Sequence, residues 1–508
     1  MKRILHWPLA PFLLGAYPVI YVYSVNLGSI DASVVVMPLI VAVLAAAFLN
    51  LLCAVSMRSW HKGALIADFV LFSSYLWTSF IDTVCPWIYG SPLSKLIALA
   101  IIAAILILAW FFGRYLHRKP KRPRWTALAN LSSLLLLVIP VTQIAWFQIT
   151  SAHRKNLATE LPEQKMFSYV RPDVYYIILD GYASSSVLAK DLGYDNSDFT
   201  SFLSRKGFFV ARKSRSNYAY TYLSLASSMN MDYINDLDEA PDQQQECIRR
   251  ISDNSVMRLF RAKGYKIIHF APSWLITSQS PYTEATFNPR VMNEFENLIL
   301  KRFLLRPFLK QGIMNAYKAR TLYTFHCLEQ IAEDPRSTFV FAHILCPHPP
   351  FVFDREGNTP ELKPILHRPP GSRDWYPKER YTDQVHYLNH LVEATVDQIL
   401  KKSKCPPIII IQGDHGAACD GTSDNPSPLM VRERMGIMNA YYVPIELRKK
   451  LYPSITPVNT FRLLGDYLFH AHFKLLPDLS YYSGPMDATP YHFVNVRKWL
   501  PDETRKKS

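Results

Sequence analysis

The first 150 residues alternate between long apolar stretches and short polar loops. Five stretches of about 17–24 residues are nearly free of charge, and we place them near residues 8–27, 34–54, 64–84, 95–113 and 126–149. Each is long enough to cross a hydrocarbon core about 30 Å thick. The first stretch lacks a small-residue cleavage site and four more stretches follow it, which disfavours a cleaved signal peptide. The pattern therefore predicts a bundle of five membrane helices over residues 1–150.

After residue 150 the pattern changes to short apolar runs separated by amphipathic stretches. Residues 151–171 are polar, with breaking prolines, and are expected to form a linker. Residues 172–508 are expected to form a second domain. Its predicted strands are 173–180, 265–271, 338–345, 407–412 and 439–443. Its clearest predicted helices are 254–263, 381–402 and 458–470. Strands that alternate with helices predict an α/β domain with a mainly parallel sheet flanked by helices.

Basic residues lie in alternate loops of the apolar region. Lys2 and Arg3 precede the first stretch, two more lie in the second loop, and six lie between residues 114 and 124, whereas the third loop has at most Lys95. The positive-inside rule then puts the N-terminus in the cytoplasm, and five crossings put the second domain outside it. The cluster at 114–124 could be taken for a nucleic-acid patch, but its position between two spans favours topology and contact with anionic lipid.

Composition separates the same two parts. The chain has 508 residues and a formal net charge of +15 at pH 7, yet residues 1–150 hold only three acidic residues. Seven cysteines are too few for a disulfide scaffold in a chain of this length, and no Cys-x-x-Cys pair suggests a structural zinc module. The composition thus indicates a membrane part joined to an ordinary folded domain.

Two of the predicted strands end in residues that bind metal. The run 173–179 is followed by Asp180, and the four isoleucines at 408–411 are followed closely by Asp414 and His415. Open α/β sheets bind ligands at the carboxyl ends of their strands. Carboxylate and imidazole donors at that edge suit a divalent metal. The alternative for Asp180 is that it only caps the helix that begins near residue 184.

Two further segments complete a resemblance to a known family. One is Ser216–Ser228, which reads Ser-Asn-Tyr-Ala-Tyr-Thr-Tyr-Leu-Ser-Leu-Ala-Ser-Ser, and the other is the His-x-Pro-Phe-like element around His348. Together with Asp180 and the Asp414-His415 pair they resemble the alkaline phosphatase superfamily, specifically its sulfatase-like branch. With five membrane spans in front, the chain resembles the membrane transferases that make lipoteichoic acid or move phosphoglycerol and phosphoethanolamine groups.

The resemblance implies a metal set and a nucleophile. Asp180, Thr221, Asp414 and His415 would bind one divalent ion, with Mn²⁺ or Zn²⁺ most compatible with mixed oxygen and nitrogen donors. Thr221 would be the nucleophile at the start of a helix, activated by the metal and the helix N-terminus. The alternatives are an inert N-cap at Thr221 and, less compatible with the match, Ser224 as the nucleophile.

The resemblance also implies catalytic and substrate-binding histidines. His348 matches the histidine that contacts the transferred phosphate and could stabilise charge or protonate a leaving oxygen; otherwise it is a turn residue. His269, Trp274 and His343 are expected to contact substrate. Core or rim positions are the alternative for His269 and Trp274. His343 could instead bind a second metal, contact a metal-binding residue without touching the metal, or be a core histidine.

Departures from the family pattern narrow the expected reaction. The stretch Thr-Tyr-Leu-Ser-Leu at 221–225 replaces the Cys-x-Pro-Ser-Arg of true sulfatases, which puts sulfate hydrolysis in doubt. Residues 417–434 contain no histidine, which makes phosphoethanolamine less favoured than phosphoglycerol.

We therefore expect a transferase of the bacterial inner membrane, multi-pass, with an extracytoplasmic catalytic domain. It would move a phospho-head group from a lipid donor to a glycan or lipid acceptor through a phosphothreonine intermediate. No nucleic-acid partner is expected. The alternatives are a hydrolase of the same fold, acting as a phosphodiesterase, phosphatase or sulfatase, and a non-catalytic membrane scaffold.

Overall fold

The computed structural model describes residues 7–28, 30, 32–84, 93–119, 123–155, 171–239, 243–272, 277, 280–360, 377–485 and 490–500. These residues form two compact units. The first comprises the described residues up to 155 together with Met292–Ile313, and the second comprises the other described residues. Below they are called the bundle unit and, because the second holds the residues expected to be catalytic, the catalytic unit.

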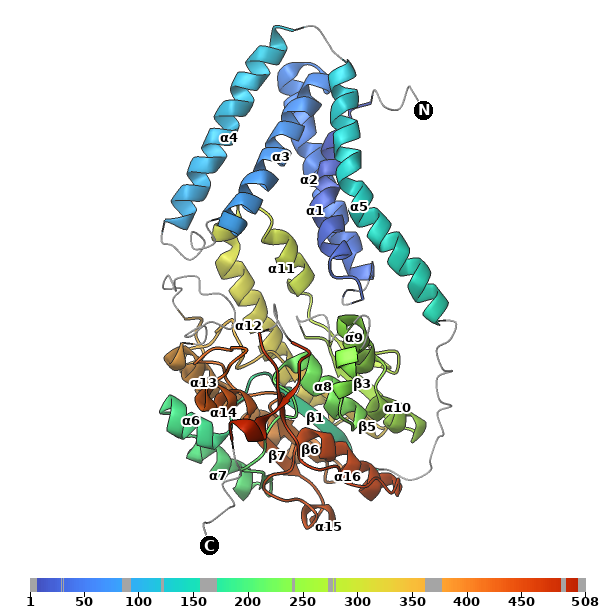
Figure 1. Ribbon diagram of the computed structural model, residues 1–508, viewed down its shortest axis with the longest axis vertical. Coiled ribbons are helices and arrows are strands. Elements are labelled where there is room, and N and C mark those ends of the chain that lie inside the picture. The colour runs from blue at the N-terminus through green and yellow to red at the C-terminus, as the bar shows by residue number, and fades with distance from the viewer. Residues whose placement is uncertain are drawn as a thin grey trace. The chain divides into compact units, whose positions relative to one another are not determined.

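Five helices make up most of the bundle unit (Figure 1): α1 Ala10–Ser24, α2 Ala32–Met57, α3 Trp60–Val84, α4 Ser94–His117 and α5 Pro123–Lys155. They match the five predicted stretches closely. By length and composition α2, α3, α4 and residues Arg124–Thr150 of α5 can each cross a membrane, whereas α1 is a shorter apolar helix. Many of their large apolar side chains are exposed, as expected of surfaces that face lipid.

Small residues and one asparagine hold these helices together. A Cβ added to Gly15 of α1 would lie 2.6 Å from the Cβ of Ala46 in α2, so the two helices cross in close contact. Asn130 of α5 accepts hydrogen bonds from the backbone N–H groups of Leu9 (3.0 Å) and Ala10 (2.8 Å). Its side chain thus satisfies donors at the start of α1 that water cannot reach.

Residues 292–313, which come late in the sequence, also belong to the bundle unit. They include α11 (Glu294–Leu300) and the start of α12 (Arg306–Ile331). Arg302 lies over the ring of Tyr21, 5.5 Å from its centroid. Arg306 forms an ion pair with Asp82, with 3.4 Å between Nη1 and Oδ1. The hydrophobic pattern did not predict this return of the chain to the bundle.

The catalytic unit is built on a seven-stranded sheet with the order β2-β7-β6-β1-β5-β3-β4. Strand β1 lies in the middle and pairs in parallel with both β5 and β6, whereas β7 runs antiparallel to β6 and to β2. The strand bounds are β1 Val174–Leu179, β2 Phe209–Val210, β3 Lys266–Phe270, β4 Ala285–Phe287, β5 Thr338–Ile344, β6 Ile408–Gln412 and β7 Asn439–Tyr442. The mainly parallel sheet confirms the predicted fold class.

Side-chain alternation along β1 explains why helices cover both faces of the sheet. Tyr176 and Ile178 pack into one core and Tyr175, Ile177 and Leu179 into the other. The first core involves α8 Thr221–Asn230, α9 Gln243–Ser252, α10 Ser255–Ala262, α14 Pro428–Met435, α15 Ile445–Arg448 and α16 Pro457–Phe469. The second involves α6 Ser185–Leu192, α7 Ser197–Arg205, α12 and α13 Lys378–Lys402.

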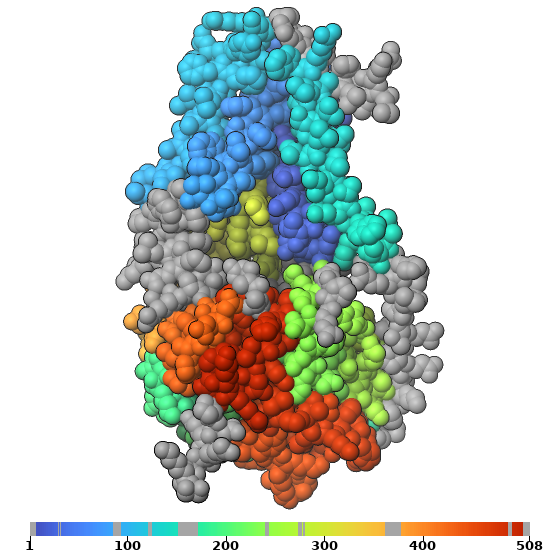
Figure 2. Space-filling view, in the orientation of Figure 1, coloured from blue at the N-terminus to red at the C-terminus, as the bar shows by residue number. Residues whose placement is uncertain are grey.

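The C-terminal part of the chain closes over this unit. Strands β8 (Tyr481–Tyr482) and β9 (Val494–Asn495) form a separate antiparallel pair, followed by the 3-10 helix η5 (Val496–Lys498), whereas the 3-10 helix η3 (Asn235–Glu239) lies earlier, between α8 and α9. In Figure 2 the orange and red surface of the chain from α13 onward covers much of the visible face of the catalytic unit. The tyrosine of β8 at 481 stacks on Tyr218, which leads into the segment that carries Thr221. Strand β8 therefore packs against the segment that carries the candidate nucleophile Thr221.

Candidate metal centre and nucleophile

Three neighbouring parallel strands bring acid and histidine side chains to one edge of the sheet. Asp180 directly follows β1, His343 lies at the end of β5, and Asp414 lies just beyond β6. Their ligand atoms lie within 4.8 Å of one another, and all three residues are buried. His343 Nε2 is 3.3 Å from Asp180 Oδ2. This cluster could hold a metal ion.

Backbone contacts fix the two carboxylates in place. The N–H of Asp180 donates to the carbonyl of Ile344 on β5 (3.0 Å), and the N–H of Gly181 donates to Asp414 Oδ1 (2.9 Å). Asp180 Oδ1 and Asp414 Oδ2 have no hydrogen-bond partner among the described residues. Buried carboxylate oxygens are costly without a partner, and a cation between them would supply one. The donor set therefore fits a divalent metal.

Thr221 is the first residue of α8 and lies beside this cluster. Its Oγ1 is 3.1 Å from His415 Nε2, and the same nitrogen is 3.5 Å from Asp180 Oδ1 and 3.6 Å from Asp414 Oδ2. His415 Nε2 thus lies within 3.6 Å of an atom of each of the other three residues predicted to bind the metal. Thr221 is only 7% exposed, so its hydroxyl faces the cluster rather than bulk water.

Hydrogen bonds to backbone carbonyls set the tautomers of two histidines. His415 Nδ1 donates to the carbonyl of Gly416 (2.9 Å), which leaves the lone pair of Nε2 directed at Thr221 and the carboxylates. His348 Nδ1 likewise donates to the carbonyl of Pro349 (2.7 Å). A carbonyl partner on one ring nitrogen orients the other for a ligand or a proton. In both rings Nδ1 is thus the nitrogen that donates to the main chain.

His348 is held close to the metal cluster by its main chain. Its N–H donates to the carbonyl of Asp180 (2.9 Å), and its ring centroid is 6.3 Å from that of His415. His348 is less buried than the ligand residues. It is thus the more accessible histidine beside the cluster.

Burial and neighbouring charges make the ionisable groups of the cluster unlike each other. Burial, and after it the Asp180 carboxylate, raises the pKa of Asp414 to about 6. Burial also acts to raise the pKa of Asp180, but the surrounding imidazoles, His348 foremost, outweigh it and hold that pKa below its ordinary value. Burial, followed by the Arg434 guanidinium, lowers the pKa of His415 well below its ordinary value. His415 is therefore neutral at pH 7, as a metal ligand must be.

The three residues expected to contact substrate, His343, His269 and Trp274, differ in where they lie. His343 is brought to Asp180, and its Nδ1 lies 2.8 Å from Thr277 Oγ1. His269 is buried in β3 with its ring against Phe341 (5.4 Å), and burial lowers its pKa to about 4. Trp274 lies outside the described residues. Substrate contact by these three residues stays a prediction.

Arg434 and Tyr381 support the site and were missed in the sequence. Arg434 of α14 donates from Nε to the carbonyl of Ala219 (2.5 Å), and its guanidinium lies 5.2 Å from the ring centroid of Tyr220. It thus holds the segment just before Thr221. Tyr381 of α13 donates to the carbonyl of Gly181 (2.8 Å) and accepts from the N–H of Ala183 (3.0 Å), which fixes the loop after Asp180. Neither residue belongs to a local motif, since each acts on a loop far away in the sequence.

Comparison with known proteins adds a family to this geometry. The family model described as Sulfatase matches residues 172–461, which is more than half of the chain. The chain belongs to the sulfatase family. The recognised resemblance to the sulfatase-like branch of the alkaline phosphatase superfamily is thereby confirmed, and the catalytic unit is that of an enzyme, a phosphotransferase or a hydrolase.

Several solved structures are similar to this sulfatase-family chain. The C-terminal periplasmic domain of EptC from Escherichia coli shares 14% identity, covering 68% of this chain and 97% of its own, with a TM-score of 0.43. The lipooligosaccharide phosphoethanolamine transferase A from Neisseria meningitidis, an integral membrane protein, shares 13% identity, covering 91% of this chain and 95% of its own, with a TM-score of 0.39. No curated protein sequence matches the chain.

Proposed function

We propose that this chain is a metal-dependent transferase that moves a phospho-head group from a membrane lipid to an envelope acceptor, with Thr221 as the nucleophile. The observation that carries the proposal is the convergence of Thr221, His415 and two carboxylates. Thr221 Oγ1 lies 3.1 Å from His415 Nε2, at the N-terminus of a ten-residue helix. A helix N-terminus attracts phosphate oxygens through its free N–H groups and dipole.

The donor set supports a metal requirement. Asp180, Asp414, His415 and Thr221 offer oxygen and nitrogen donors, and His343 Nε2 lies 3.3 Å from Asp180 as a further donor. Mn²⁺ or Zn²⁺ suits such a mixed set. When bound, the ion would lower the pKa of the Thr221 hydroxyl and neutralise charge on the phosphate.

The residues of the site would divide the reaction between them. Thr221 Oγ1 would attack phosphorus and give its proton to water, a Thr221–phosphate bond would form, and the bond from phosphorus to the diacylglycerol oxygen would break. His348, whose Nδ1–H donates to Pro349, would in its doubly protonated form give its Nε2 proton to the leaving diacylglycerol oxygen. An acceptor hydroxyl would then attack the same phosphorus and pass its proton to His348 Nε2, while the bond from phosphorus to Thr221 breaks and Thr221 Oγ1 takes a proton back from water. A second attack of this kind by water instead would make the enzyme a hydrolase.

The bundle unit supports a lipid donor and a location in the bacterial inner membrane. It has four helices long and apolar enough to cross a bilayer and one shorter apolar helix. Basic residues concentrate in the loops of one end, so we propose that this end and the N-terminus are cytoplasmic and the catalytic unit extracytoplasmic. An anchored site meets lipid head groups at high effective concentration. The acceptor would be another envelope lipid or a glycan.

The test measures release of diacylglycerol by full-length protein purified in detergent. Wild type and Thr221→Ala are incubated with labelled phosphatidylglycerol or phosphatidylethanolamine in the presence of Mn²⁺ or Zn²⁺. Thr286→Ala is the matched control, because Thr286 is exposed on the edge strand β4, which β3 and β5 separate from β1. We expect release from wild type and control and none from Thr221→Ala. Turnover of soluble phosphate esters alone, without release from either lipid, would replace the transferase with a hydrolase.

A further inference from the structure

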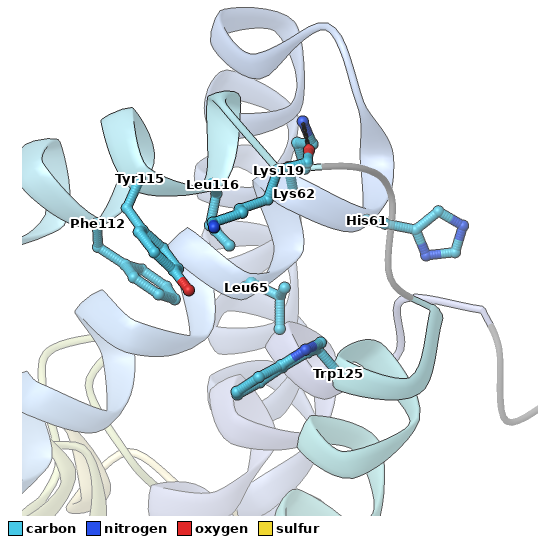
Figure 3. A pocket seen from close by; sticks show the side chains of 8 residues that line it. All are labelled: His61, Lys62, Leu65, Phe112, Tyr115, Leu116, Lys119 and Trp125. Atoms are coloured by element: carbon cyan, nitrogen blue, oxygen red, sulfur yellow. Dashed lines mark hydrogen bonds between the residues drawn. The ribbon is translucent and has the colours of Figure 1, made fainter.

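A pocket lies in the bundle unit, between the start of α3, the end of α4 and the start of α5. Its empty volume is about 560 Å³, a figure that includes space open to solvent. Figure 3 shows Phe112 and Tyr115 on one side, Leu65 and Trp125 below, and Lys62 and Lys119 above. The walls are therefore apolar and aromatic, and the rim is cationic.

The two lysines give this pocket its chemistry. Lys62 Nζ donates to the carbonyls of Lys119 (2.8 Å) and His117 (3.3 Å), which fixes the ammonium at the end of α4. An ammonium has three donors, so these bonds leave its charge and one N–H for an anion. Lys119 Nζ lies 5.4 Å from the ring centroid of Tyr115. Contacts with the end of α4 thus hold both cations beside the pocket.

The charged side chains that line the pocket are basic. Residues 57–67 and 110–126, which supply the lining, contain no aspartate or glutamate, and Arg58, Arg114, Arg118 and Arg124 add positive charge nearby in sequence. The nearest acid in sequence, Asp68, is buried in α3. The excess of cations attracts anions from the surroundings. Pocket and loops lie at the end of the bundle that the positive-inside rule assigns to the cytoplasm.

The aromatic walls indicate that the anion is attached to a lipid. Trp125 and Tyr115 are 54% and 56% exposed, at the ends of helices that can cross a membrane. Such exposed rings at a helix end are typical of the membrane–water interface. Leu65 and Phe112 continue the apolar surface from the lysines along α3 and α4. A soluble anion would use the lysines but not these walls.

We propose that this pocket binds the phosphate of an anionic glycerophospholipid in the cytoplasmic leaflet, with Lys62 and Lys119 on the phosphate and its chains along α3, α4 and α5. Basic pockets between spans on the cytoplasmic side recognise such head groups. The site is separate from the catalytic unit and takes no part in head-group transfer. A lipid bound there would remain attached to the bundle unit.

Native mass spectrometry of the full-length protein tests this proposal. The Thr221→Ala background is used, with equal amounts of phosphatidylglycerol and phosphatidylcholine, so that no donor is consumed. We expect phosphatidylglycerol to be retained preferentially. Lys62→Gln with Lys119→Gln should weaken this retention about 30-fold, roughly fivefold for each lysine. Lys95→Gln, an exposed lysine at the other end of α4, is the matched control and should retain lipid as the background does.

Two further arms keep the result interpretable. Among the described hydrogen bonds, none comes from the Lys119 side chain, so the single variant Lys119→Gln should fold and still weaken lipid retention about fivefold. Lys62→Arg keeps the positive charge and should preserve lipid retention. Equal retention of phosphatidylcholine, or unchanged retention in both Lys119→Gln and the double variant, would overturn the proposal. Inorganic phosphate that displaces the lipid at equal concentration would also overturn it, because the site would then take a soluble anion.

Discussion

Gly416 offers a sharp test of how the Asp414–His415 pair is held. Its N–H donates to the carbonyl of Arg434 (2.7 Å), and its own carbonyl accepts from His415 Nδ1. A Cβ added here would lie 2.1 Å from the carbonyl oxygen of Glu433 and 2.6 Å from that of Gly436. Both obstacles are backbone atoms, which cannot rotate away. Gly416→Ala must therefore move the main chain next to His415.

The size of the effect follows from the overlap. Real Cβ atoms essentially never approach closer than 3.0 Å, so the chain must open by about 0.9 Å, from 2.1 to 3.0 Å. Overpacking of this kind costs about 1–3 kcal/mol of stability. A misplacement near 1 Å at a reacting centre costs about 100-fold in rate. We expect folded Gly416→Ala protein with turnover reduced about 100-fold and all metal-binding side chains intact.

The assay compares turnover and thermal unfolding of wild type, Gly416→Ala and Gly312→Ala. Gly312 in α12 is the matched control, because an added Cβ there meets nothing within 4 Å. Its replacement should keep full turnover and add up to about 1 kcal/mol of helix stability. Wild-type turnover in Gly416→Ala would refute the reasoning, since the backbone around His415 would then tolerate displacement.

Three further predictions concern other parts of the catalytic unit. Tyr381→Phe removes the hydrogen-bond partner of the Gly181 carbonyl and of the buried Ala183 N–H. The free energy of unfolding should therefore fall by about 2 kcal/mol, which thermal unfolding would show as a lower midpoint, and turnover should fall with it. Hydrogen bonds from arginines hold the pKa values of Asp236 and Glu246 below their ordinary ranges. The ion pairs of these two carboxylates with Arg250 therefore stabilise the fold at pH 7. This stabilisation is lost as the pH falls through the lowered pKa values, because the carboxylates are then protonated. Arg250→Ala should thus cost less than about 1 kcal/mol at pH 7, given the exposure of Asp236, and still less near pH 3, as followed by thermal unfolding across pH. A chelator should abolish diacylglycerol release, and Mn²⁺ or Zn²⁺ should restore it; full activity in the chelator would argue against the metal.

Much of the fold could be read from the hydrophobic pattern. The strand predicted at 173–180 is β1 at Val174–Leu179, and the isoleucine run is β6, because strands buried on both faces leave continuous apolar runs. The five apolar stretches became α1–α5 for a similar reason. The short strands β2 and β4 escaped prediction, since two or three residues show no periodicity. The return of residues 292–313 to the bundle unit was also hidden, because it depends on contacts such as Arg306 with Asp82.

The sequence predicted only those residues of the candidate site that lie next to the end of a strand or the start of a helix. Asp180, Asp414 and His415 follow strands and Thr221 opens a helix, so the pattern singled them out. Arg434 contacts the carbonyl of Ala219, which lies 215 residues earlier. A contact of that kind arises from tertiary packing and leaves no trace in local sequence.

The most direct test of the central claim is mass spectrometry of Thr221 after reaction with the lipid donor. Full-length wild type is incubated with the donor and metal, quenched in denaturant and digested. The account predicts a phospho-head group on the peptide that contains Thr221, lost when acceptor is added before the quench and absent from Thr221→Ala. Diacylglycerol release with no modified Thr221, or with the group on Ser224 instead, would contradict it.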